Sequence, residues 1–161
     1  MSKKADRSKA GVIAGLVETR RQILETASTI PLEQQDQAFV GEWAIKDLLA
    51  HLAGWDYTNL EGVKALLAGE VPGFFAQHDR DWKTYNAMLV ARHKRDDLAG
   101  MIAAVQEAQK ELVAFLNTLT DEDFHRTVHV NTFRMSIGGL LNFEIKDEKG
   151  HLEQIRQFLL A

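Results

Sequence analysis

The chain has 161 residues and a mass of 18.1 kDa, and its composition (45% hydrophobic, 26% charged) is that of a globular protein, so we expect residues 1–161 to form a single domain. A net charge of -4 lacks the basic excess that nucleic-acid phosphates require, and we therefore expect no nucleic-acid partner. The sequence has no cysteine, which excludes disulfides and a cysteine nucleophile, and no signal-peptide pattern or apolar run of about 18 residues, which predicts a cytoplasmic protein without a membrane partner.

Apolar residues recur three and four positions apart along most of the chain, which predicts an all-α protein. Four long amphipathic segments with a short helical one after the second indicate a four-helix bundle with a short extra helix. The expected elements, in chain order, are a helix over 12–30, a helix over 45–67, a loop over 70–81, a short helix over 82–89, a helix over 98–119, a loop or short extended piece over 124–135, and a helix from 137 nearly to 161.

The last predicted helix carries ionisable residues where a core-facing helix is normally apolar. At 100° per residue, Glu144, Asp147, Glu148 and His151 fall on or beside its apolar face. An unpaired buried carboxylate is costly, so it becomes neutral or finds a cation. We therefore expect these groups to have a compensating partner inside the bundle.

Three of the polar residues have the composition of a metal site. Asp147 and His151 lie four positions apart, so their side chains project side by side from the last helix. His51 flanks the apolar face of the second helix and is a candidate third ligand. Two imidazoles and one carboxylate suit zinc, iron, nickel or manganese and leave open coordination positions. The alternative is a hydrogen-bonded His–Asp pair without any metal.

An aromatic and polar cluster follows the second predicted helix and includes Trp82, Tyr85 and Asn86. One interpretation is that these side chains cover an end of the bundle or a dimer face. The other is that they form a lid or wall that binds a substrate or cosubstrate beside the metal. The sequence leaves both open.

Three segments together resemble the DinB-like superfamily. Residues 42–55 (EWAIKDLLAHLAGW) are similar to its second-helix motif, and residues 81–86 (DWKTYN) are similar to the middle motif of its ClbS-like branch. Residues 147–155 (DEKGHLEQI) resemble its final helix, which usually carries His-x-x-x-His. The resemblance implies a four-helix bundle, commonly a homodimer, with a divalent metal held by His51, Asp147 and His151. Asp147 stands where the family usually has histidine.

The resemblance also implies a function. Similar proteins include metal-dependent transferases that use an exogenous low-molecular-weight thiol, so we expect a thiol-dependent S-transferase, or a hydrolase, acting on a small electrophile. Glu144 or Glu148 would act as a base or orient the site. The alternative is a metal-free bundle of the ClbS-like kind that binds a small molecule for self-protection.

Overall fold

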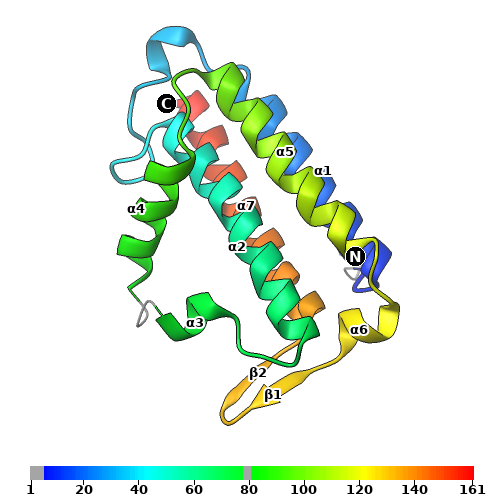
Figure 1. Cartoon of the computed structure of the whole chain (residues 1–161). Helices are drawn as coiled ribbons and strands as arrows, with labels where there is room; N and C mark the ends of the chain where they lie inside the picture. Colours follow the sequence, from blue (N-terminus) through cyan, green and yellow to red (C-terminus); the bar gives the residue numbers. More distant parts are fainter. Residues whose placement is uncertain (1–5, 78–80) are drawn as a thin grey trace.

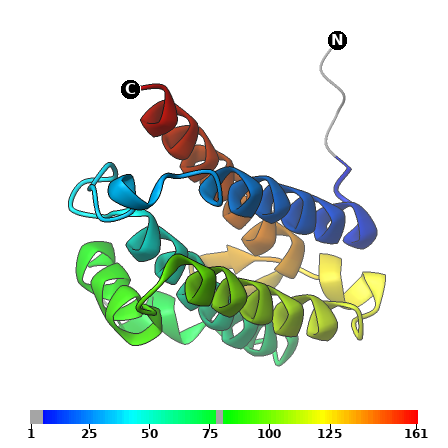
Figure 2. The same cartoon turned by 90° about the horizontal axis from the view of Figure 1, so that it is seen from above.

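A computed structural model describes residues 6–77 and 81–161, and it confirms the all-α four-helix bundle (Figure 1). The first long helix packs mainly on the last, and the second packs on the third and also contacts the last; Figure 2 looks down on this arrangement. None of the helices among the described residues has the length and apolarity needed to cross a membrane. The long helices are α1 (Lys9–Ala27), α2 (Ile45–Leu67), α5 (Leu98–Leu116) and α7 (Ile137–Leu160).

The connections contain more structure than the sequence predicted. Two short helices, not one, follow α2, because part of the predicted loop over 70–81 is helical; His78 and Asp79 of that loop lie outside the described residues. The predicted loop or extended piece forms a hairpin, whose turn places Asn131 at φ 53°, a left-handed conformation that asparagine tolerates. The shorter elements are η1 (Leu32–Gln34), α3 (Gly73–Gln77), α4 (Trp82–His93), α6 (Asp121–His125), β1 (Val128–Val130) and β2 (Phe133–Met135).

Local hydrogen bonds define where several helices begin. The side chains of Asp81, Asp97 and Ser136 each accept a hydrogen bond from the backbone N–H three residues later, at 3.0, 2.6 and 2.9 Å. Ala44 precedes α2 and has no such side chain. Instead, Asp47 accepts a hydrogen bond from the Ala44 N–H at 3.0 Å, so α2 keeps half of a capping box.

The interior of the bundle is apolar at both ends and polar between them. Two clusters of buried aliphatic and aromatic side chains fill the ends. A buried polar group must be hydrogen-bonded or paired with an opposite charge. The contacts of the polar residues in the middle of the bundle therefore determine the chemistry of this region. The buried polar and charged residues are Thr19, Arg20, His51, Asp56, Asn59, Glu144 and Glu148.

Candidate metal centre

His51, Asp147 and His151 come together between α2 and α7. Each offers one ligand atom, and these atoms lie within 4.8 Å of one another. Asp147 Oδ2 is 3.3 Å from His151 Nε2, and the His51 and His151 rings are 5.2 Å apart. The four-residue spacing on α7 places the first pair side by side, while the packing of α2 on α7 supplies the third residue.

His51 is held by aromatic neighbours in a buried position. Its ring lies 4.9 Å from the Trp43 ring and 6.4 Å from the Trp55 ring, and it is 5% exposed. Burial, reinforced by the positive charge of His151, lowers the pKa of His51 to about 4. The imidazole is therefore neutral near pH 7, which is the form that binds metals, and its buried Nδ1 has no hydrogen-bond partner among the described residues.

Asp147 and His151 form a pair whose charges support one another. The hydrogen bond from His151 lowers the pKa of Asp147 despite partial burial. Burial alone would lower the pKa of His151, but its hydrogen bonds to Asp147 and Gln154 outweigh this and raise it. His151 Nδ1 is 2.7 Å from Gln154 Oε1, so the neutral ring can donate there and leave Nε2 facing Asp147.

The donor set fits a first-row divalent ion. Imidazole nitrogen and carboxylate oxygen ligands lie about 2.0–2.2 Å from such an ion, so two adjacent ligand atoms are separated by about 2.8–3.6 Å at a tetrahedral or octahedral centre. The 3.3 Å between Asp147 Oδ2 and His151 Nε2 already matches this spacing. His51 supplies the third ligand atom, which lies within 4.8 Å of the other two.

A buried ion-pair network lies behind these three residues. Arg20 of α1 donates from Nε to Glu148 Oε1 at 2.6 Å and from both Nη atoms to the Asp56 carboxylate at 2.7 and 2.9 Å. All three side chains are at most 2% exposed. Arg20 is thus the compensating partner that the buried Glu148 requires, and it joins α1, α2 and α7 in the middle of the bundle.

Arg20 does not balance all of the nearby carboxyl groups. Glu144 is also buried, and burial together with the negative charges of Glu148 and Asp56 raises its pKa well above its ordinary value, against the opposing effect of Arg20. Glu148 Oε2 has no hydrogen-bond partner among the described residues. This excess of acidic groups favours a proton or a divalent cation close by.

The sequence interpretation missed Arg20, Asp56 and Asn59. Two of them interrupt an apolar stripe: Arg20 follows Leu16 by four positions on α1, and Asp56 follows Leu52 by four on α2. The signal used for the last helix, an ionisable residue on an apolar face, was therefore present on two other helices as well.

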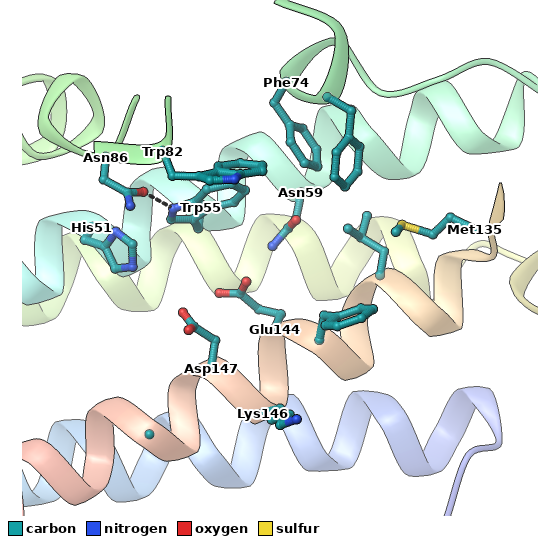
Figure 3. Close-up of a pocket in the computed structure, with 14 residues that line it drawn as sticks. His51, Trp55, Asn59, Phe74, Trp82, Asn86, Met135, Glu144, Lys146 and Asp147 are labelled. Atoms are coloured by element: carbon teal, nitrogen blue, oxygen red, sulfur yellow. Dashed lines mark hydrogen bonds between the residues drawn. The ribbon is translucent and has the colours of Figure 1, made fainter. Parts of the chain in front are cut away.

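A cavity of about 660 Å³ opens beside the candidate ligands (Figure 3). His51, Asp147 and Glu144 line one side of it, and aromatic side chains line much of the rest. The residues around the cavity are His51, Trp55, Asn59, Phe74, Phe75, Trp82, Asn86, Met135, Leu140, Phe143, Glu144, Lys146, Asp147 and Gly150.

The other predicted site residues divide between two places. Trp82 and Asn86 line the large cavity, where Asn86 Oδ1 accepts a hydrogen bond from Trp55 Nε1 at 2.7 Å. Tyr85 lines a separate cavity of about 290 Å³, and its hydroxyl is 3.0 Å from the Thr58 hydroxyl. Glu148 faces Arg20 and does not line the large cavity, whereas Glu144 does.

Glu144→Gln is expected to stabilise the metal-free protein, and more so at higher pH. Because the folded-state pKa of Glu144 is raised, its contribution to stability is complete below its unfolded pKa and is lost as the pH rises through the folded pKa. Glutamine removes that loss. The melting temperature of the variant in EDTA should match wild type near pH 4.5 and exceed it at pH 8, by about 2–4 °C for each kcal/mol recovered.

The control for this prediction is Glu153→Gln, which changes an exposed glutamate of the same helix. It should shift the melting temperature little at either pH. A Glu144→Gln variant whose difference from wild type is the same at both values would contradict the raised pKa.

Comparison with known proteins agrees with this fold. The family model of the DinB superfamily matches residues 16–155. Among solved structures, YfiT from Bacillus subtilis, described as a probable metal-dependent hydrolase with an unusual four-helix bundle topology, has a TM-score of 0.70 at 19% identity over 98% of this chain and 89% of that one. An uncharacterised protein from Clostridium difficile 630 has a TM-score of 0.79 at 13% identity, covering 98% and 99%. A search of curated proteins finds no match.

One further neighbour corrects the expectation about nucleic acids. The colibactin self-resistance protein ClbS, crystallised in complex with a dsDNA, has a TM-score of 0.75 at 13% identity over 96% of both chains. The sequence-based exclusion of a nucleic-acid partner is therefore wrong. It relied on a net charge of -4, but net charge does not describe how charge is distributed over a surface.

Proposed function

The chain belongs to the DinB superfamily, and on that basis we propose that it is a divalent-metal-dependent enzyme acting on a small electrophilic molecule. The observation that carries this proposal is the convergence of His51, Asp147 and His151 beside a cavity of about 660 Å³. A metal centre buried without access would serve structure alone. Here His51 and Asp147 line the cavity, so a molecule inside it can reach the centre.

Each residue has a defined role in this proposal. His51, Asp147 and His151 would hold the ion, which would supply Lewis acidity and would lower the pKa of a thiol or water bound to it. Glu144 lines the cavity, and its ionised form would accept the proton released by the nucleophile. Glu148, held by Arg20, orients the turn of α7 that carries Asp147 and His151.

The nucleophile must come from outside the chain, because there is no cysteine to supply it. We propose an exogenous low-molecular-weight thiol, which makes the protein a thiol-dependent S-transferase. Trp82 and Asn86 on the cavity wall would contact this cosubstrate or the electrophile, and Tyr85 would position α4 through its contact with Thr58. Water is the second candidate nucleophile, supported by the description of YfiT as a probable metal-dependent hydrolase.

Elemental analysis of untagged protein purified without added metal tests the proposal first. Near-stoichiometric transition metal is expected, or uptake of zinc, nickel, iron or manganese by protein stripped with EDTA. The loaded protein is then incubated with chlorodinitrobenzene and nitrophenyl esters, each with and without a thiol. Metal-dependent thioether formation supports the transferase, and metal-dependent ester cleavage without thiol supports the hydrolase. Failure to bind any of the four ions would overturn both.

That failure would favour the other candidate, a metal-free bundle that binds a small molecule for self-protection. The likeness to ClbS, a colibactin self-resistance protein, supports this candidate. Because ClbS is crystallised with a dsDNA, binding measurements on this chain should include a duplex oligonucleotide, with the dependence on salt recorded.

A further inference from the structure

We propose that the cavity beside the candidate metal centre selects flat aromatic molecules that carry one uncharged hydrogen-bonding head group, and that the metal-free protein discriminates against anions. The inference rests on the proposed function for its catalytic meaning, since it names the substrate class of the same site. Three features of the cavity support it: the aromatic wall, the polar end and the balance of charge.

The aromatic wall is continuous. The Trp55 ring lies 5.4 Å from the Phe74 ring and 5.8 Å from the Trp82 ring, and Phe75 lies 4.3 Å from Phe74 and 6.2 Å from Trp82. Rings at these separations contact one another directly. They therefore form one surface on which a flat molecule can stack, and they do not leave between them the space that an aromatic cage around a cation requires.

The polar end of the cavity is formed by Asn59 and Glu144. Asn59 is 1% exposed and lines the cavity; its Nδ2 makes no hydrogen bond of good geometry with any described residue, although it is directed at Glu144 and slightly opposes the rise in the pKa of that carboxyl. Figure 3 shows Asn59 and Glu144 pointing toward each other across this end. A poorly bonded buried amide is costly, so a ligand acceptor placed there gains a better hydrogen bond to Nδ2 than the empty protein supplies. The raised pKa of Glu144 gives a second group that can bond an uncharged head.

In the metal-free protein the balance of charge at this end opposes an anion. Glu144 and Asp147 line the cavity, and the Arg20 cation behind them is already paired with Glu148 and Asp56. Lys146 is the only lysine or arginine among the described residues that line the cavity, and it is exposed to solvent. A ligand carboxylate would be repelled by the acidic side chains of the wall, whereas a neutral amide or hydroxyl brings no like charge to them.

The volume is consistent with this class of ligand. Sites for small molecules usually enclose about 300–1,000 Å³ and are mostly apolar with a few placed polar groups. The 660 Å³ here accommodates a fused aromatic system together with its head group.

Three naphthalene probes of matched shape test the proposal: naphthamide, naphthoate and naphthylmethylammonium. Their dissociation constants are measured by ligand-observed NMR on the EDTA-treated protein, so the result does not depend on metal or turnover. Naphthamide is expected to bind at least about tenfold more tightly than naphthoate. Trp82→Ala should weaken naphthamide binding about fivefold or more, because it removes part of the stacking surface.

Two further variants separate the polar end from the wall. Asn59→Leu should abolish the preference for naphthamide over unsubstituted naphthalene, and Glu144→Gln should narrow the difference between naphthamide and naphthoate. Leu32→Ala, an exposed position that does not line the cavity, should change nothing. Equal or tighter binding of naphthoate, tenfold tighter binding of the ammonium probe, or no binding of any probe would each overturn the proposal. Metal uptake measured separately would still decide the proposed function.

Discussion

Replacing Arg20 by methionine is expected to lower the free energy of unfolding by about 3–5 kcal/mol. Methionine fills much of the same space, but it removes the cation that bonds Asp56 and Glu148 inside the bundle. Both carboxylates are buried and would lose their charge partner, a loss that costs far more than an intact buried pair contributes. Urea unfolding followed by circular dichroism at pH 7 measures the change.

The neighbouring arginine supplies a matched control. Arg21 also pairs with two glutamates, Glu18 and Glu25, but these pairs are exposed to solvent, so Arg21→Met should change the free energy of unfolding very little. A triple variant, Arg20→Met with Asp56→Asn and Glu148→Gln, should regain much of the stability lost in the single variant, because no buried charge is left unpaired. Equal effects of the Arg20 and Arg21 substitutions on the free energy of unfolding would show that the buried network contributes no more to stability than the exposed ion pairs.

Loss of His151 is expected to weaken the binding of a divalent metal by more than about 100-fold. Residues that only support a metal ligand typically account for 10- to 100-fold in affinity, and the removal of a ligand itself costs more. His151→Ala leaves Asp147 and His51 as the only members of the candidate set. Zinc and nickel affinities, measured by competition with a coloured chelator, give the comparison with wild type.

His51→Ala should produce a similar loss, and circular dichroism must first show that this buried substitution leaves the bundle folded. The control is His129→Ala, which removes an exposed histidine of β1 outside the candidate set. It accounts for adventitious metal binding by surface histidines. Wild-type affinity in both the His151 and His51 variants would remove these residues from the metal site and the enzymatic proposal with them.

Several features of the fold could be predicted from short-range pattern alone. Apolar residues three and four apart identified the four long helices, and Asp81, Asp97 and Ser136 cap helices because their side chains reach a backbone N–H three residues on. The predicted ends of the helices were less accurate. α1 was predicted to continue to Ile30 but ends at Ala27, and α3 was not predicted at all, because turns of a few residues carry too little periodicity to identify.

The arrangement of the candidate ligands also depends partly on local spacing and partly on tertiary packing. The spacing of Asp147 and His151 places them side by side on any helix, so this pair and its position beside the apolar face follow from local geometry. The meeting with His51 depends on how α2 packs against α7, and the partner of Glu148 depends on α1 bringing in Arg20 from 128 positions away. The aromatic wall likewise combines side chains from α2, α3 and α4. Helical periodicity acts over one or two turns of a single helix. Contacts between distant segments arise only when the apolar faces of the helices pack together. That packing decided which buried charges are paired and which face the cavity.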